Sequence, residues 1–147
     1  MKRLLLLLAC CCLLLGFLTA CGGEEGLQDG YYTAQVAEYN NGWKEFITIM
    51  VKGGEIVSVE YNAENASGFI KSWDNAYMQT MLRIQGTYPN EYTRYYGSQL
   101  LGSTGEIEID AITGATSSYQ SFQKLAAAVI EQARAGDSST IIVDVTE

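Results

Sequence analysis

Three segments with β-strand character, joined by two very short turns, constrain the fold of this chain more than any other feature. Residues 31–39, 44–52 and 55–61 are rich in Tyr, Thr, Val and Ile, side chains that favour strands. Residues 40–42 read Asn-Asn-Gly and residues 53–54 read Gly-Gly, which are typical of tight hairpins. Because strands joined in this way pair with their sequence neighbours, the sequence predicts a three-stranded antiparallel meander.

Side chains alternate between two faces along the second and third of these segments. In residues 44–52 one face carries Ile47, Ile49 and Val51. The opposite face carries Phe46, Thr48 and Met50. The same spacing in the third segment predicts that the side chains pointing toward the core are Val57, Val59 and Tyr61.

The middle of the chain is predicted to be helical. Residues 69–84 form the first expected helix, in which four large side chains lie about one turn apart on one side: Trp73, Tyr77, Met81 and Ile84. A loop at residues 86–89 precedes a second, Tyr-rich helix near residues 91–101.

The last helix has the clearest apolar stripe. Its apolar residues recur at steps of three and four: Tyr119, Phe122, Leu125, Ala126, Val129, Ile130 and Ala133. Ser117 followed by Gln120 fits a capping box, and Gly136 is a natural stop. Residues 140–145 can return as a final strand. The expected fold class is therefore α+β: an antiparallel meander of about three strands packed with two to three helices, and a possible C-terminal strand.

The first twenty residues have the layout of an export signal. Lys2 and Arg3 precede an uncharged apolar run over residues 4–18, which is shorter than the ~20 residues that a membrane span needs. The run ends in Leu18-Thr19-Ala20-Cys21, which resembles the lipobox of bacterial lipoproteins. That resemblance implies cleavage before Cys21 and lipidation of its sulfur, with two acyl chains such as palmitate for stable anchoring.

This interpretation divides the chain into three parts: a signal peptide at 1–20, a lipidated cysteine with a flexible tether at 21–29, and one domain at 30–147. The alternatives are an ordinary secretory signal or an uncleaved anchor. The expected location is the outer face of the cytoplasmic membrane, with the lipid bilayer as a partner through Cys21.

The remaining composition excludes several kinds of chemistry. Cys10, Cys11 and Cys12 fall in the leader as apolar filler, so Cys21 is the only cysteine of the mature chain, and the sequence has no histidine. These counts exclude a His-dependent nucleophile system, a haem attachment motif, an iron–sulfur ligand set and a thiolate/imidazole zinc site. We assign no catalytic residue and no metal ligand.

The charge of the chain also limits its partners. Removing Lys2 and Arg3 from the nine basic residues leaves seven against 17 acidic ones, a net charge near −10. Such a surface disfavours nucleic acid as a partner.

Residues 110–118 precede the last helix and read Asp-Ala-Ile-Thr-Gly-Ala-Thr-Ser-Ser. They bring small residues and hydroxyls to a helix N-terminus, where free amide donors and the positive end of the dipole suit a phosphate. Gly114 and Ala115 leave the backbone open, and Thr116 offers a hydroxyl. The plainer alternative is that a hydroxyl only caps the helix and that Asp110 only closes a turn.

This segment resembles the flavinylation motif of the FMN-binding domain family, in which Asp, two variable residues and Ser or Thr precede Gly-Ala-Thr. Every fixed position matches: Asp110, Thr113, Gly114, Ala115 and Thr116. The Asp29-Gly30 start, the Gly42-Trp43 turn with Phe46 and the Gly-Gly hairpin also look like extracellular lipoprotein members of that family.

The resemblance implies a covalent cofactor. In that family a flavin transferase uses FAD and magnesium to join FMN, through its phosphate, to the last threonine of the motif. The resemblance therefore implies that Thr116 is the attachment residue. It also implies that Gly114 and Ala115 give the transferase access and that Asp110 and Thr113 shape the loop. The isoalloxazine ring would then contact aromatic side chains. The candidates are Trp43, Trp73 and the tyrosine cluster formed by Tyr88, Tyr92, Tyr95 and Tyr96.

We therefore expect an electron carrier rather than an autonomous enzyme. The FMN would take electrons from a membrane quinone-linked donor and pass them to an extracellular acceptor or a partner reductase. One alternative is a ligand-binding lipoprotein without flavin, taking an aromatic, sugar or anionic ligand. Another is a precursor of a pheromone released from the leader, whose end is residues 16–20.

Overall fold

Four strands form one sheet in the order β3-β2-β1-β4. The computed structural model describes residues 26–145; the expected leader at 1–20 and Cys21 lie outside the described residues. The strands are β1 (Gly30–Val36), β2 (Lys44–Lys52), β3 (Glu55–Glu64) and β4 (Ile141–Val143). The helices are the short 3-10 helix η1 (Lys71–Trp73), α2 (Asn75–Gln85), α3 (Pro89–Ser98) and α4 (Thr116–Ala135).

The sheet confirms the expected α+β fold and its C-terminal strand. β1, β2 and β3 pair as an antiparallel meander, and β4 adds to β1 in parallel. The first hairpin is closed by a pair of backbone hydrogen bonds between Asn40 and Trp43, of 2.8 and 3.0 Å. Asn41 and Gly42 between them have φ of 51° and 83°, the left-handed conformations that a two-residue hairpin of this twist needs.

A bulge in β3 changes which side chains face the core. Ile49 pairs with Val59, but Val51 pairs with Ile56, because the register shifts between Met50 and Val51. Val57 is the extra residue and is 47% exposed, while Ile56 is fully buried in its place. The expected inward position of Val57 is therefore wrong, whereas Tyr61 and the partly buried Val59 pack on the core as expected.

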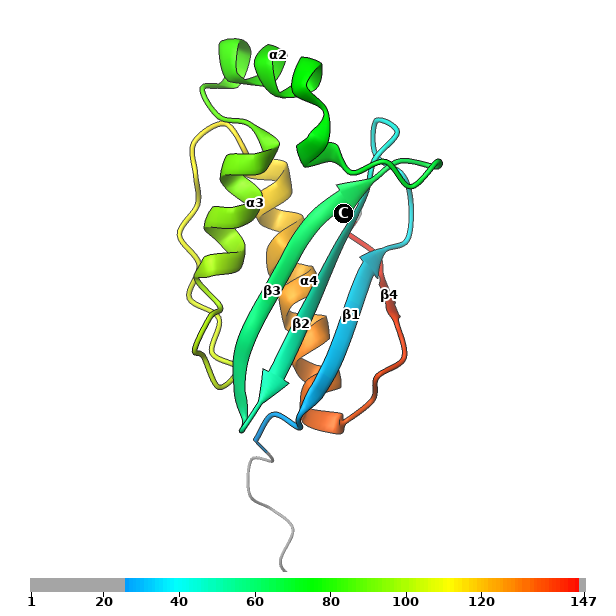
Figure 1. Ribbon diagram of the computed structural model, residues 1–147, viewed down its shortest axis with the longest axis vertical. Helices are drawn as coiled ribbons and strands as arrows, with labels where there is room; N and C mark the ends of the chain where they lie inside the picture. The colour runs from blue at the N-terminus through cyan, green and yellow to red at the C-terminus, as the bar shows by residue number, and fades with distance from the viewer. Residues whose placement is uncertain (1–25, 146–147) are drawn as a thin grey trace, which may run out of the picture.

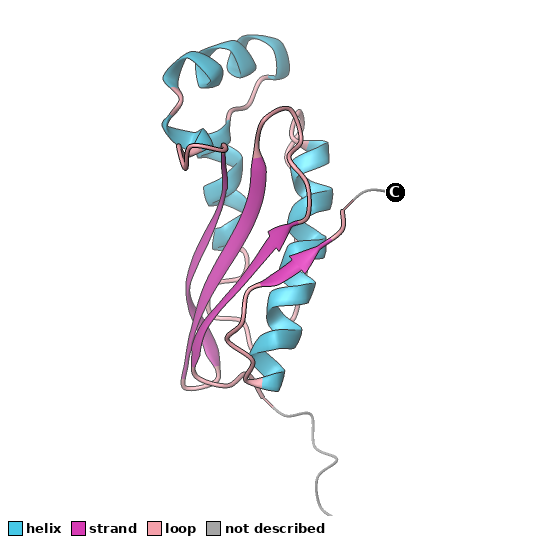
Figure 2. Ribbon diagram, turned by 90° about the vertical axis from the view of Figure 1, so that its right-hand side faces the viewer, coloured by secondary structure: helices cyan, strands magenta, loops and turns pink. Residues whose placement is uncertain are grey.

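The helix α4 covers one face of the sheet and carries most of the core (Figures 1 and 2). Its buried side chains pack against β1 and β2, and they include Phe122, Leu125, Ala126, Val129 and Ile130. The helix ends at Gly136, whose φ of 67° makes it the left-handed cap that was expected. No helix within residues 26–145 combines the length and the apolarity required to cross a membrane.

The single helix expected over residues 69–84 is broken at Asp74. The Asp74 carboxylate accepts a hydrogen bond of 2.9 Å from the Tyr77 amide, so a new helix, α2, begins after η1. The break changes the helical phase, and Trp73 and Ile84 are 65% and 71% exposed rather than buried. None of the residues of α2 is buried, and the helix lies across one end of the molecule (Figure 1).

The second helix of the middle region is close to its expected place. α3 begins at Pro89, a favoured first position because proline lacks the amide that would be left unpaired there, and it ends at Ser98. Tyr92 and Tyr96 are fully buried and join Tyr61 and Phe122 in an aromatic core, where Tyr96 stacks on Phe122 at a centroid distance of 5.5 Å.

Candidate functional site

The start of α4 has no side-chain cap. Ala115 is the N-cap residue, and no side chain hydrogen-bonds there to the first amides of the helix. The expected capping box of Ser117 and Gln120 is wrong, because the helix begins at Thr116 and Ser117 already lies inside the first turn. The first-turn amides thus lack the side-chain acceptor that would normally compete with an external anion.

Thr116 occupies the first position of this helix and its side chain is exposed. An exposed hydroxyl at an uncapped helix N-terminus lies where the helix dipole is positive, which favours a negatively charged group bonded to it. The geometry therefore suits a phosphate or a phosphoester better than the plain capping role.

Gly114 allows two parts of the chain to meet. Its φ is 85°, and a Cβ atom at this position would lie 2.3 Å from the carbonyl oxygen of Gln85, the last residue of α2. Any other residue would be strained in this conformation and would push on the backbone of α2. The glycine thus has a packing role, besides the access for a modifying enzyme that the motif resemblance implies.

Two tyrosine hydroxyls form hydrogen bonds with the backbone of the loop at residues 109–115, which contains most of the motif. Tyr96 Oη accepts a hydrogen bond of 3.2 Å from the Ile112 amide and donates one of 3.4 Å to the Ala115 carbonyl. Tyr119 Oη donates to the Ile109 carbonyl at 3.1 Å. The sequence pattern indicated the tyrosine-rich stretch only as a candidate for ring contacts; the structure shows that Tyr96, which belongs to it, also orients the loop.

Gln99 fixes the beginning of the same loop. Its amide oxygen accepts a hydrogen bond of 2.7 Å from the Asp110 amide, and its Nε2 donates to the Asp110 carbonyl at 3.4 Å. Nothing in the sequence pattern pointed to Gln99, because it precedes the motif by eleven residues and belongs to the end of α3.

The side chains of the five motif residues divide into two groups. Asp110, Thr113 and Thr116 are exposed, whereas Ala115 is buried and Gly114 is half-buried. Within residues 26–145, no side chain hydrogen-bonds to the Asp110 carboxylate or to the Thr113 hydroxyl. The loop is therefore held by its backbone and presents its polar side chains outward.

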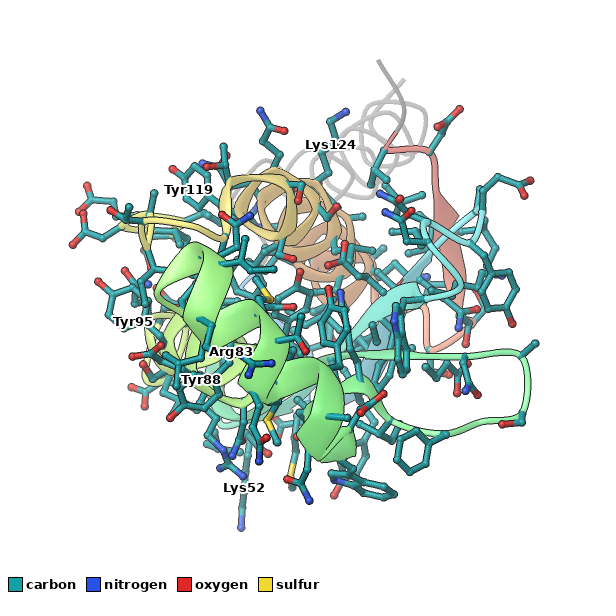
Figure 3. The ribbon with its side chains drawn as sticks, turned by 90° about the horizontal axis from the view of Figure 1, so that it is seen from above. Lys52, Arg83, Tyr88, Tyr95, Tyr119 and Lys124 are labelled. Carbon is teal, nitrogen blue, oxygen red and sulfur yellow. The ribbon has the colours of Figure 1, made fainter. Side chains whose placement is uncertain are left out.

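Two hollows flank the start of α4 and share Tyr77 and Ser117. The larger has a volume of about 550 Å³ and lies under α2; its lining residues are Tyr77, Met81, Gln85, Gly114, Thr116, Ser117 and Gln120. The smaller, of about 120 Å³, includes Trp43, Glu45, Lys71 and Ser118 in its lining. Figure 3 looks onto this end of the molecule, with α2 in green and α4 beside it in yellow and orange, seen nearly along its axis.

Of the aromatic residues considered as ring contacts, the structure brings Trp43 beside the helix start and leaves Trp73 elsewhere. Trp43 lies in the smaller hollow, and its ring centroid is 6.2 Å from that of Tyr77. Trp73 lines a third hollow of about 660 Å³ between β3 and α3, which contains none of the motif residues. That hollow has the greatest volume of the three, but the start of α4 contributes no residue to it.

The site offers oxygen and amide groups rather than a metal centre. Within residues 26–145, no three side chains of His, Cys, Asp or Glu gather where they could hold a metal ion. A bound group at this site would therefore be held by the helix N-terminus, the Thr116 hydroxyl and aromatic surface.

Comparison with known proteins agrees with this description. The model of a family described as the FMN-binding domain matches residues 42–131. A 15 kDa lipoprotein of Treponema pallidum (strain Nichols) is 34% identical over 117 residues, covering 79% of this chain and 83% of that protein. The crystal structure of a protein from Clostridium perfringens superposes with a TM-score of 0.75 at 35% identity, covering 80% of this chain and 98% of that one.

Proposed function

Because the chain belongs to the FMN-binding domain family, we propose that it is a lipid-anchored flavoprotein that carries FMN covalently on Thr116 and transfers electrons outside the cytoplasmic membrane. The observation that carries this proposal is the exposed Thr116 hydroxyl at an uncapped helix N-terminus, facing a hollow of about 550 Å³.

The residues present fit an FMN phosphate. The first-turn amides of α4 and its dipole offset the phosphate charge, and Gly114 keeps the approach free of a side chain. The exposed Asp110 and Thr113 are accessible to a flavin transferase. That enzyme would transfer FMN from FAD to the Thr116 hydroxyl, breaking the diphosphate and releasing AMP.

When bound, the flavin supplies the redox chemistry that this histidine-free chain cannot supply itself. The protein's own residues bind and orient the group. Tyr96 and Gln99 fix the loop that carries the phosphate, and Tyr77 and Met81 offer apolar surface in the hollow beside it. A phosphoester bond leaves the ring unmodified and prevents loss of the cofactor outside the cell.

The position of Thr116 bears on the direction of electron transfer. Gln28, near the end of the expected tether, donates from its backbone amide a hydrogen bond of 2.9 Å to the Ala133 carbonyl at the far end of α4. Thr116 and Ala133 are separated by most of a helix that rises ~1.5 Å per residue, a distance of roughly 25 Å. The proposed flavin site thus lies at the opposite end of the domain from the expected anchor, which favours an acceptor away from the membrane.

The same distance sets a condition for the membrane donor. Leu27 is buried and Gln28 is hydrogen-bonded to the domain, so only residues 21–26 are left to extend. At full extension they would span roughly 20 Å, which allows the domain to tilt its flavin end toward a quinone-linked donor. The resemblance of the chain to a lipoprotein supports anchoring through Cys21.

The test is production of the full chain together with a flavin transferase, followed by denaturing electrophoresis and intact-mass measurement. We expect a fluorescent band whose mass is increased by one FMN. The Thr116→Val variant should lose the fluorescence, and Ser117→Ala, which removes the neighbouring exposed hydroxyl, should keep it. A colourless wild-type band of unmodified mass would refute covalent attachment and would favour the ligand-binding alternative.

A further inference from the structure

A lysine held between two aromatic rings lies beside the start of α4. Lys71 belongs to η1, and its Nζ is 5.2 Å from the ring centroid of Tyr77 and 6.0 Å from that of Trp43. These distances are within the range of cation–π attraction. Three separate segments, the first hairpin turn, η1 and α2, therefore converge to hold one ammonium group in place.

This cluster borders the proposed flavin site. Lys71 lines the smaller hollow together with Ser117 and Ser118 of the first turn of α4. Tyr77, one of its two aromatic neighbours, also lines the larger hollow that contains Thr116. The ammonium and the attachment hydroxyl thus line neighbouring hollows that share Tyr77 and Ser117, although 45 positions separate the two residues in the sequence.

Among the described residues, the main partners of this charge are the two rings rather than an acidic side chain. Lys71 is half-buried and forms no ion pair with another described residue. Burial lowers the pKa of its ammonium group from the ordinary value, and the nearby Glu45 carboxylate acts in the opposite direction. Glu45 in turn accepts a hydrogen bond of 3.0 Å from the Tyr61 hydroxyl. The two aromatic rings compensate part of the lost hydration, and the ammonium has no ion-pair partner among the described residues, which leaves its charge available to a negatively charged group at the neighbouring site.

We infer that Lys71 sets the reduction potential of the flavin carried on Thr116. Two-electron reduction of a flavin with uptake of one proton leaves a negative charge on the ring system, and a fixed positive charge nearby favours the reduced form. Trp43 and Tyr77 hold the ammonium in position and keep it from swinging into solvent. This inference rests on the proposed function, since it needs FMN at Thr116.

The experiment compares midpoint potentials of flavin-loaded protein by spectroelectrochemical titration. In Lys71→Met we expect the ratio of reduced to oxidised flavin at a given potential to fall about tenfold, which for a two-electron couple is a midpoint about 30 mV lower. Lys71→Arg keeps the charge and should stay close to the wild-type potential. Lys52→Met removes the same charge from the exposed end of β2 and should also leave the potential unchanged.

The outcomes separate the two proposals. Wild-type protein without flavin would refute the proposed function and, with it, the role of Lys71. Flavin-loaded Lys71→Met with the wild-type potential would refute only the role of Lys71, as would an equal shift in Lys52→Met. Circular dichroism checks that each variant is folded; if Lys71→Met is not, Lys71→Gln gives the same test, with the same potential shift expected and the same unchanged value refuting it.

Discussion

Replacing Gly114 by alanine tests whether this motif glycine is needed for packing. A Cβ atom at Gly114 would lie 2.3 Å from the Gln85 carbonyl oxygen and 3.1 Å from its carbonyl carbon. Gly102 is a matched control, because its φ of 78° is similar to the 85° of Gly114 but a Cβ atom there would meet nothing within 4 Å.

Both substitutions therefore lose stability because alanine is strained at a positive φ, and only Gly114→Ala adds a steric collision. Alanine in the left-handed conformation costs about 1–2 kcal/mol at either position. At Gly114 the collision with a backbone atom adds about 1–3 kcal/mol if the surroundings resist. Since α2 has no buried residue, it can shift, and we expect the additional loss to lie near the lower end, about 1 kcal/mol.

The assay is urea and thermal unfolding of protein made without a flavin transferase. We expect Gly114→Ala to unfold at a temperature roughly 4 °C below Gly102→Ala, which is the shift that 1 kcal/mol gives in a domain of this size. Equal stability of the two variants would refute the packing argument. If Gly114→Ala then failed only in flavin attachment, the glycine would act through access of the transferase alone.

Two further predictions concern the tyrosines. Tyr96→Phe removes the acceptor of the Ile112 amide and should lower the free energy of unfolding, measured in urea, by about 1–2 kcal/mol. The control Tyr95→Phe, at an exposed position, should change it by less than about 0.5 kcal/mol. Equal effects of the two substitutions would contradict the role of the Tyr96 hydroxyl. Burial, followed by the Glu45 charge, raises the pKa of Tyr61 well above 10, and burial also raises the pKa of Tyr92. Above pH 10 the unfolded chain loses these protons and the folded one keeps them, so the free energy of unfolding should fall by about 1.4 kcal/mol per pH unit for each tyrosine. Urea unfolding between about pH 9 and 11 checks this slope. Tyr61→Phe should make it less steep by up to about 1.4 kcal/mol per pH unit, while Tyr92, Tyr77 and Tyr96, whose pKa values are also raised, still contribute. An unchanged slope in that variant would refute the assignment.

The meander, the last helix and the motif were readable from the sequence because each depends on neighbouring residues. The turn between Asn40 and Trp43 needs only Asn41 and Gly42 to adopt left-handed conformations. The stripe of α4 repeats with the period of a helix, and Gly136 ends it. Local conformation and side-chain periodicity decide such features, and both can be recognised from residues that are close together in the sequence.

The middle helices show where this local reasoning fails. The spacing of Trp73 and Ile84 fits a helix with a buried side, but spacing does not reveal that Asp74 caps a new helix and changes its phase. Val57 is exposed for a similar reason. One bulged residue reverses the alternation of side chains along β3, and the composition of the strand does not reveal where that bulge lies.

For the site, the sequence by itself determined the motif and the attachment candidate, Thr116, together with the family to which the chain belongs. Only the tertiary structure decided what surrounds them: the contact of Gly114 with Gln85, the loop held by Tyr96, and Lys71 beside the first turn of α4. The physical reason is that these neighbours come from distant parts of the chain. Packing of the whole core brings them together, and no local pattern encodes such an encounter.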